Sequence, residues 1–375
     1  MKEDWKECKL GDVVEINQNS FSEKENWLFV NYLDTGSITE NKISEIQYIN
    51  LIDEKLPSRA KRKVKKNSII YSTVRPNQKH FGIIKSFPEN FLVSTGFAVL
   101  DVNKKIAFPD FVYYYLIQNE NTESLHAIAE QTTSAYPAIK PSDIADISII
   151  LPPLTTQQKI AQILSSLDDK IELNNKINDN LEQQAQVIFK SWFVDFEPFG
   201  GKMPKGWKMG KLSDLITVKY GKDHKKLEDG SYPVYGSGGI MRYVDKFLYD
   251  KESVLIPRKG TLNNVFYINE PFWSVDTMFY TEMTKENLAK FVYFFVKGKD
   301  LNSMNAGSAV PSMTTEILNA IEVVIPSDEY LEKFENIVSP MFKQIKQCII
   351  ENENLASIRD TLLPKLMNGE IGVEL

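Results

Sequence analysis

Metal ligands and disulfide-forming residues are scarce in this sequence. It has two cysteines, Cys8 and Cys348, and three histidines, His80, His126 and His224. Two cysteines cannot build a disulfide framework, and the scattered histidines form no metal-ligand cluster with them. We therefore expect no metal site in this chain, and a reducing, cytoplasmic location.

Long hydrophobic runs are also absent. The longest, from Asp146 to Leu154, is far too short for a membrane span of about 20 residues. Residues Met1 to Trp5 lack the apolar segment of a secretory signal. The 42% hydrophobic and 25% charged content is ordinary for a soluble globular protein, and 375 residues favour two or more domains. We expect no membrane contact.

Catalytic motifs are missing too. The segment Gly236 to Gly239 (GSGG) is followed by no Gly-Lys-Ser/Thr, so it is neither a P-loop nor a dinucleotide site. Leu151 to Leu154 (LPPL) lacks the Asn or Asp and the aromatic residue that amino-methyltransferases place around a Pro-Pro pair. No nuclease-like cluster of carboxylates and lysine is recognisable, and Asp276 is interpreted as structural. We assign no catalytic residue and no cofactor to the chain itself.

Positive charge is in deficit overall but locally concentrated. The net charge of −6 and the pI of about 5.4 argue mildly against a nucleic-acid binder, whose footprint is usually basic. However, Lys55 to Lys66 (KLPSRAKRKVKK) carries seven basic residues and no acidic one. Such a run is as compatible with a solvated loop as with DNA contact. Local charge is therefore more informative than the total.

The most informative feature that is present is an internal repeat. Trp5-Lys6 recurs as Trp207-Lys208 at an offset of 202 (207 − 5). The offset is 185 at Ser68 (253 − 68) and 180 at Phe111 (291 − 111), and it stays at 174 (309 − 135) from residue 135 onward. The front of each half thus tolerates changes in length and the back does not. This indicates a variable recognition domain on a rigid spacer.

The constant part of each half is predicted to be a long helix. From Ile160 and again from Phe334, seam positions alternate in steps of four and three, which is the heptad pattern of a coiled coil. Pro152-Pro153 precede the first helix, Pro198 to Gly201 end it, and Asn368-Gly369 end the second. The first seam is Ile160, Leu164, Leu167, Ile171, Asn174, Asn178, Leu181, Ala185, Ile188 and Trp192; the second is Phe334, Val338, Met341, Ile345, Cys348, Asn352, Leu355, Arg359, Leu362 and Leu366.

Two asparagines occupy equivalent seam positions, Asn178 and Asn352. Polar groups there would weaken packing but fix the register and the orientation of the partner helix. Helices of about 35 to 40 residues would be roughly 55 Å long, and antiparallel pairing would place the variable domains at opposite ends. The alternative is an ordinary amphipathic helix on each domain.

These residues carry a family resemblance that covers essentially the whole chain. Leu151 to Phe199 resembles the central conserved region of Type I restriction–modification specificity subunits, and Asn352 to Gly372 resembles their C-terminal conserved region. Pro57 to Gly82, and the segments YPVYGSGGI, VLIPRKGTLNNVFY and FWSVDTMFY, resemble target-recognition domains. The resemblance implies a non-catalytic subunit that reads a two-part DNA sequence.

The same resemblance implies a fold and a set of partners. We expect a mixed α+β fold in which two mixed α/β target-recognition domains, 1–152 and 201–326, are separated by an antiparallel two-helix coiled coil, 153–200 and 327–375. The implied partners are double-stranded DNA and two DNA adenine methyltransferase subunits. Restriction subunits can join them, although a methyltransferase-only complex is equally compatible. S-adenosylmethionine, ATP and Mg²⁺ are expected in these partner subunits.

Candidate DNA contacts gather at matching points of the two halves. Affinity needs cations on phosphates, whereas specificity needs paired donors and acceptors at base edges. Taken alone, each candidate is more typical of an ordinary surface residue. Their recurrence in two matching loops favours DNA contact. In the first half they are the cations Arg59, Lys61, Arg62, Lys63, Lys65 and Lys66, and then Ser72, Thr73, Arg75, Asn77, Gln78, Lys79 and His80. In the second half they are Lys222, Lys225, Lys226, Tyr235, Ser237, Arg242, Arg258, Lys259, Thr261, Asn263 and Asn264.

Both variable domains are expected to contain strands and helices. Strands are expected at Ser68 to Tyr71, Phe91 to Leu100, Val254 to Ile256 and Met278 to Thr281, and helices at Pro109 to Ile117 and Glu286 to Val296.

A nuclease with an unrecognised active site would show metal-dependent catalysis by the isolated chain. A coiled-coil scaffold would show no salt-dependent DNA binding even in a complex. The repeat and the loop chemistry favour the specificity subunit over both.

Overall fold

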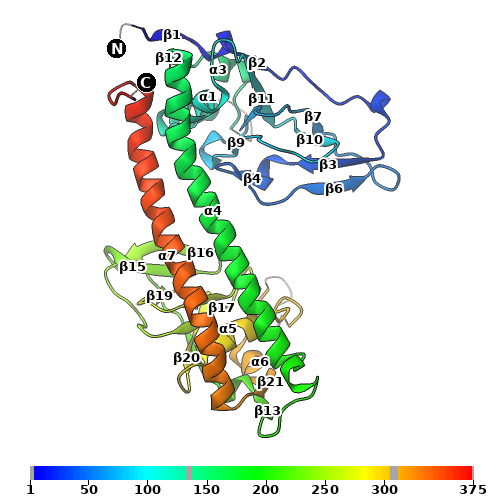
Figure 1. Cartoon of the computed structure of the whole chain (residues 1–375), viewed down its shortest axis with the longest axis vertical. Coiled ribbons are helices and arrows are strands. Elements are labelled where there is room, and N and C mark those ends of the chain that lie inside the picture. Colours follow the sequence, from blue (N-terminus) through cyan, green and yellow to red (C-terminus); the bar gives the residue numbers. More distant parts are fainter. Residues whose placement is uncertain (1–3, 132–136, 305–310, 374–375) are drawn as a thin grey trace. The chain divides into compact units, whose positions relative to one another are not determined.

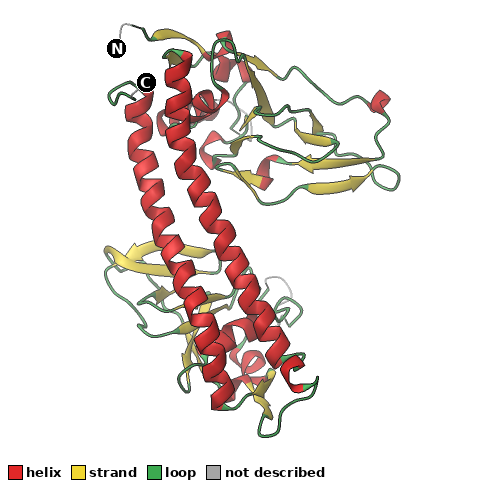
Figure 2. Cartoon of the chain, in the orientation of Figure 1, coloured by secondary structure: helices red, strands yellow, loops and turns green. Residues whose placement is uncertain are grey.

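The protein consists of two compact units, and each contains part of both long helices. The computed structural model describes residues 4–131, 137–304 and 311–373 (Figure 1). Unit 1 comprises Met1–Leu173 and Ile350–Leu375, and unit 2 comprises Asn174–Ile349. Helices and strands occur in both units (Figure 2), which confirms the mixed α+β class. The predicted ranges 1–152, 153–200, 201–326 and 327–375 follow the chain rather than these units and stay a prediction.

Two four-stranded sheets form the body of unit 1. The first is antiparallel, in the order β2 (Val14–Ile16), β11 (Phe97–Val102), β8 (Ile69–Ser72) and β9 (Phe81–Ile83). The second has the order β6 (Gln47–Asn50), β3 (Phe29–Leu33), β10 (Phe91–Ser94) and β7 (Ala60–Arg62), with β10 parallel to β3. Two ladders, β1 (Lys6–Lys9) with β12 (Ser148–Leu151) and β4 (Ile38–Thr39) with β5 (Lys42–Ile43), accompany α1 (Pro109–Leu116), α2 (Asn119–Glu130) and α3 (Pro141–Ala145).

Strand β8 is buried on both faces, which explains its continuous apolar sequence. Ile69 and Tyr71 belong to the same core cluster as Phe111 of α1. Ile70 points the other way and packs with Val93 of the second sheet. Because side chains alternate along a strand, β8 joins the helices of unit 1 to its second sheet.

Unit 2 repeats this arrangement. Its first sheet has the order β14 (Ile216–Tyr220), β20 (Met278–Met283), β17 (Ser253–Pro257) and β18 (Phe266–Ile268). Its second sheet has the order β16 (Gly239–Val244), β15 (Asp229–Gly236) and β19 (Trp273–Ser274), with β19 parallel to β15. A ladder of β13 (Lys208–Lys211) with β21 (Glu322–Ile325) accompanies α5 (Ala289–Lys297) and α6 (Thr315–Ala320).

The register of the two units agrees with the sequence repeat. Phe97 pairs with Ser72 in unit 1, and Met278 pairs with Pro257 in unit 2. Ser72 and Pro257 are related by the offset of 185 (257 − 72) that the sequence predicted. The internal repeat is therefore a repeat of structure.

The long helices α4 (Leu154–Phe193) and α7 (Asp328–Met367) are antiparallel within each unit. In unit 1, Lys170 pairs with Glu351 at 3.4 Å and Asp168 pairs with Arg359 at 2.7 Å. The residue numbers of α4 therefore decrease in the direction in which those of α7 increase. In unit 2, Phe189 contacts Phe334 and Trp192 contacts Tyr330, with ring centroids 6.1 and 6.3 Å apart. All residues of the two predicted seams are buried or half-buried.

Among the described residues, no helix combines the length and apolar character that a membrane crossing requires.

Three predicted elements differ from the structure by more than two residues or in number. The strand expected over Phe91 to Leu100 is two strands, because the chain passes between sheets at Gly96, where a Cβ would lie 2.8 Å from Thr35 Cγ2. The helix expected from Glu286 begins at Ala289, since the preceding Asn287 has a left-handed φ of 60°. The first long helix ends at Phe193 rather than at Pro198, ahead of Phe196, whose φ is 55°.

Candidate nucleic-acid interface

The loop after β8, residues 73–80 (loop 1), is fixed by backbone hydrogen bonds to a distant segment. The N–H of Arg75 donates to the carbonyl of Pro137 over 2.9 Å. The N–H of Ile139 donates to the carbonyl of Thr73 over 2.8 Å. These bonds hold the backbone of the loop. Pro76 is buried, while the side chains of Arg75, Asn77 and Gln78 are exposed.

The loop after β17, residues 258–265 (loop 2), is held in the same way. The N–H of Gly260 donates to the carbonyl of Pro311 over 3.3 Å, and the N–H of Met313 donates to the carbonyl of Arg258 over 2.8 Å. Gly260 matches Arg75 at the offset of 185 (260 − 75). Loops 1 and 2 are thus the same structural element in the two units.

Arg75 has a backbone conformation that glycine adopts freely and other residues do not. Its φ is 48°, and the corresponding Gly260 has a φ of 88°. The left-handed region costs a residue with a Cβ roughly 1–2 kcal/mol. An exposed arginine at a position where the backbone favours glycine is typical of a functional site.

Polar groups of two further segments lie beside loop 1. The hydroxyl of Thr73 donates to the carbonyl of Gly96 over 2.9 Å, and the N–H of Thr95 donates to the carbonyl of Arg59 over 2.8 Å. Burial raises the pKa of Tyr32 to about 12, and the positive charge of Arg59 opposes this rise. Residues 95 and 96 thus link the backbone of Arg59 to loop 1, and the charge of Arg59 lies near Tyr32.

The end of the basic run is separated from loop 1 along the chain by β8. Lys65 and Lys66 precede this strand, whereas loop 1 follows it. Within the described ranges, Arg59, Lys61 and Lys66 make no ion pair and are the cations best suited to phosphate contact. Carboxylates of the same unit neutralise three other candidates, in the pairs Lys63–Glu25, Lys65–Asp101 and Lys79–Glu40.

In unit 2, the turn between β15 and β16 lies against loop 2. The side-chain amide of Asn264 donates to the carbonyl of Ser237 over 2.7 Å, and a Cβ on Gly260 would lie 2.9 Å from Ser237 Oγ. The guanidinium of Arg258 donates to the carbonyl of Asp276 over 3.2 Å and lies over the ring of Tyr220. The structure therefore brings together the two groups of candidates that the sequence placed in this half.

The candidates differ in their exposure to solvent. The exposed ones are Arg59, Lys61, Lys65, Lys66, Arg75, Asn77, Gln78, Lys222, Lys225, Lys226, Lys259, Thr261 and Asn263. The half-buried ones are Arg62, Lys63, Thr73, Lys79, His80, Ser237, Arg242, Arg258 and Asn264. Which of them touch DNA stays a prediction.

Two candidates are corrected by their burial. Ser72 is buried, and its hydroxyl donates to the carbonyl of Val74 over 2.8 Å. Tyr235 is also buried, in a core cluster with Phe272, and burial raises its pKa. Both residues belong to strand segments in which consecutive residues are buried, so neither presents its side chain to DNA.

Two arginines are restrained by their surroundings. The guanidinium of Arg242 donates to the carbonyl of Leu227 and to Asp229, each over 2.9 Å. The Nε of Arg62 is buried and has no hydrogen-bond partner in the described part of the chain. Both are therefore less suited to base contact than the arginine of loop 1.

The β4–β5 hairpin is a part of the site that the sequence did not reveal. Asn41 accepts the N–H of Ile83 over 2.9 Å, and the hydroxyl of Thr39 lies 3.2 Å from Nδ1 of His80 in loop 1. Its strands have two residues each, too few for an alternating pattern. The polar run Thr39 to Lys42 between two isoleucines is a turn signal that could have identified it.

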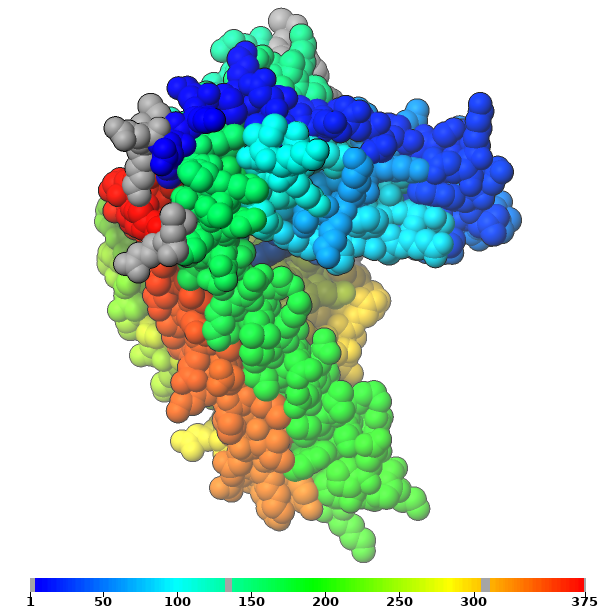
Figure 3. Space-filling view, turned by 45° about the horizontal axis from the view of Figure 1, so that its top comes forward, coloured from blue at the N-terminus to red at the C-terminus, as the bar shows by residue number. Residues whose placement is uncertain are grey.

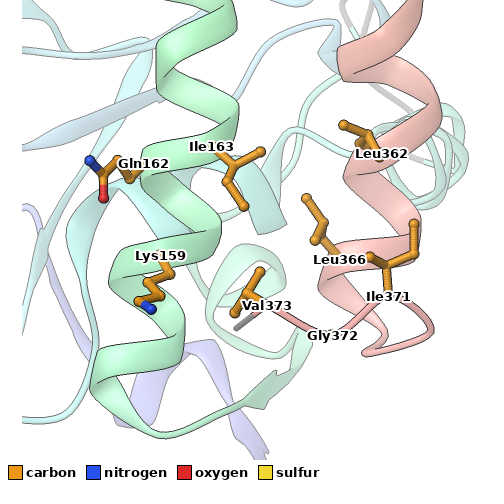
Figure 4. Close-up of a pocket in the computed structure, with 8 residues that line it drawn as sticks. All are labelled: Lys159, Gln162, Ile163, Leu362, Leu366, Ile371, Gly372 and Val373. Carbon is orange, nitrogen blue, oxygen red and sulfur yellow. The ribbon is translucent and has the colours of Figure 1, made fainter. Parts of the chain in front are cut away.

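Within the described residues, no group of three or more His, Cys, Asp or Glu could hold a metal ion. In unit 1, a mainly apolar pocket of about 360 Å³ lies between the start of α4 and the end of α7 (Figure 4). Its lining is Lys159, Gln162, Ile163, Leu362, Leu366, Ile371, Gly372 and Val373.

Comparison with known proteins identifies the family. The family model described as "Type I restriction modification DNA specificity domain" matches residues 2–183 and 204–359, once in each half of the repeat. The chain is 29% identical to the Type I restriction enzyme HindI specificity subunit of Haemophilus influenzae, over 98% of this chain and 100% of that protein. It is 25% identical to the MjaIX specificity subunit of Methanocaldococcus jannaschii, over 99% and 94%. A crystal structure of a Type I restriction-modification system S subunit from M. genitalium matches with a TM-score of 0.56 at 20% identity, over 97% of this chain and 96% of that one. The chain therefore belongs to the Type I restriction–modification DNA specificity family.

Proposed function

We propose that this protein is the DNA-specificity subunit of a Type I restriction–modification complex and that it reads a two-part site on double-stranded DNA. The observation that carries the proposal is the equivalence of loops 1 and 2, which present hydrogen-bonding side chains from the same place in the two units. The names of its relatives, which are specificity subunits, support it. Unit 1 reads one half-site and unit 2 the other.

Loop 1 has side chains suited to base edges in the major groove. Arg75 can donate two hydrogen bonds to a guanine, and Asn77 or Gln78 can pair with an adenine. One such bidentate contact discriminates against a wrong base by about 1–3 kcal/mol. Arg59 and Lys61 contact phosphates instead, and so contribute affinity without sequence preference.

Loop 2 reads with a different set of groups. Thr261 and Asn263 are exposed hydrogen-bonding side chains, and Lys259 is an exposed cation. Arg258 is half-buried over Tyr220, so it supports the loop more than it reads bases. The two units are therefore expected to recognise different half-sites.

The long helices act as the spacer and as the docking surface for partners. Each helix contributes to both units, so their fixed length sets how many base pairs stay unread. Two methyltransferase subunits bind them, each flips an adenine out of its half-site, and S-adenosylmethionine supplies the methyl group. Restriction subunits, where present, use ATP and Mg²⁺. Exposed apolar side chains on α4 and α7, whose surfaces are green and orange in Figure 3, support this docking: Ile163 and Ile358 in unit 1, and Val187 and Ile349 in unit 2.

Methylome sequencing tests the proposal. Cells that express the chain with its methyltransferase partner are compared with cells that lack only this chain. A bipartite motif with an unread gap, present only with the chain, is the expected result. With a demonstrably active methyltransferase, the absence of any dependent motif would overturn the proposal in favour of a protein scaffold.

A further inference from the structure

The tip of the β15–β16 hairpin presents apolar side chains beside loop 2. Ile240 is 49% exposed and Met241 is 59% exposed. They follow the turn at Ser237, whose carbonyl accepts the hydrogen bond from Asn264 of loop 2. An exposed hydrophobic pair therefore follows a turn that contacts loop 2, the loop that the proposed function assigns to DNA.

A β-bulge determines how Met241 is presented. The register between β15 and β16 shifts between Val234 and Tyr235, which leaves Met241 as the extra residue of its strand. Gly236 provides the space, because a Cβ there would lie 2.6 Å from the Met241 sulfur. Bulges re-aim side chains next to functional sites. The thioether thus lies across the tip of the hairpin instead of entering the core of unit 2.

The chemistry of this pair restricts what it can recognise on DNA. Ile240 and Met241 offer no hydrogen-bond donor and no charge, so they gain nothing from phosphates or from the polar atoms of base edges. The C5-methyl group of thymine is the apolar group that base pairs present in the major groove, and a two-stranded ribbon fits that groove. We propose, on the basis of the proposed function, that Ile240 and Met241 read a thymine methyl group in the half-site of unit 2.

Uracil substitution tests this inference because it removes only the methyl group. The full chain is assembled with its methyltransferase subunits on a duplex that carries the methylated motif. The half-site that Arg75→Gly leaves unaffected is the one that unit 2 reads, and each of its thymines is replaced in turn by uracil. One replacement is expected to raise the Kd about fourfold, the factor that corresponds to about 0.8 kcal/mol for one buried methyl-sized group. In Met241→Ala or Ile240→Ala this penalty is lost.

A matched control is available on another strand of the same unit. Met209 of β13 is 57% exposed, and Met209→Ala should keep the fourfold penalty. The inference would be overturned by equal Kd values for the thymine and uracil duplexes, or by a uracil penalty that persists in Met241→Ala. In either case, binding that is still specific for the motif would uphold the proposed function. Failure of Met241→Ala to assemble with the methyltransferase would assign the tip to a protein contact instead. A wild-type complex that does not distinguish the motif from a scrambled duplex would overturn the proposed function, and the inference with it.

Discussion

The two units share a backbone plan but stabilise it with different side chains. On α1 of unit 1, Asp110 forms an ion pair with Lys85, which is half-exposed. The matching residue on α5 of unit 2 is Lys290, which is only 3% exposed and pairs with Glu335 at 2.6 Å and Glu252 at 3.1 Å. The charge is reversed and buried, yet the adjoining strands keep their register. The repeat therefore preserves strand pairing rather than particular side-chain partners.

The ends of the long helices differ as well. In unit 2, Trp192 and Phe199 surround the ring of Tyr330, with centroids 6.3 and 5.0 Å from it. The residues related to Trp192 and Phe199 by the offset of 174 are Leu366 and Val373 of unit 1 (366 − 192). Both of these smaller residues line the pocket of unit 1 in Figure 4. Smaller side chains at equivalent positions thus leave space in one unit that aromatic rings fill in the other.

The largest expected effect comes from the buried charge of unit 2. Lys290→Met would leave Glu252 and Glu335 without their cation and should cost about 3–5 kcal/mol in the local stability of unit 2. Asp110→Asn, at the matching position of unit 1, should cost at most about 1 kcal/mol, because its partner Lys85 stays hydrated. Hydrogen exchange of α5 and β17, compared with α1 and β8, measures both effects. Equal losses in the two units would contradict the distinction between a buried and a half-exposed lysine.

The next effect separates recognition from stability at loop 1. Arg75→Gly relieves the left-handed strain, so it should raise the free energy of unfolding by about 1 kcal/mol. The same change removes a bidentate base contact and should lower methylation at one half-site about 10- to 100-fold, which corresponds to 1–3 kcal/mol. Gly260→Ala, its counterpart, should instead destabilise unit 2. Thermal melting and methylation of sites altered in one half at a time are the measurements, and equal loss of preference at both half-sites would contradict separate readers.

The sequence predicted whatever depends on pattern and spacing. The repeat offsets placed loops 1 and 2 at matching points, and the heptad pattern identified the inner faces of α4 and α7. Contacts between distant residues could not be derived in this way. Glu25 and Asp101 neutralise lysines of the basic run from other segments of unit 1. No local rule pairs residues so far apart in the chain.

The burial of residues at the ends of strands was also predicted wrongly for two candidate DNA contacts. Ser72 and Tyr235 belong to polar, turn-like stretches of sequence, and these suggested exposed side chains. In the structure, β8 and β15 continue through them, and consecutive residues of both strands are buried there. For Ser72, a boundary error of one residue was enough to change the side chain from exposed to buried, whereas at Tyr235 the strand itself was not predicted.

A smaller effect is expected where the helix ends differ. Trp192→Leu would open in unit 2 the space that unit 1 already has, at a cost of about 1–2 kcal/mol in stability. Leu366→Trp would place an indole beside the pocket of about 360 Å³ and should leave the stability of unit 1 unchanged or raise it. Denaturant unfolding of the two variants is the measurement. A severe loss in Leu366→Trp would show that the space is not available to a larger side chain.

The smallest expected effect concerns the two seam asparagines. The side-chain oxygen of Asn178 is enclosed and has no hydrogen-bond partner within the described ranges, whereas Asn352 makes an interaction of its own. Asn178→Leu should therefore stabilise the helices by about 1 kcal/mol, and Asn352→Leu should give no gain. Because polar seam residues fix register, the double variant should also methylate sites whose spacer is one base pair longer or shorter more readily than the wild type does. Thermal melting measures the first effect and methylation of a spacer series the second. An unchanged spacer requirement would mean that the domain contacts at the ends of the helices, rather than the asparagines, hold the register.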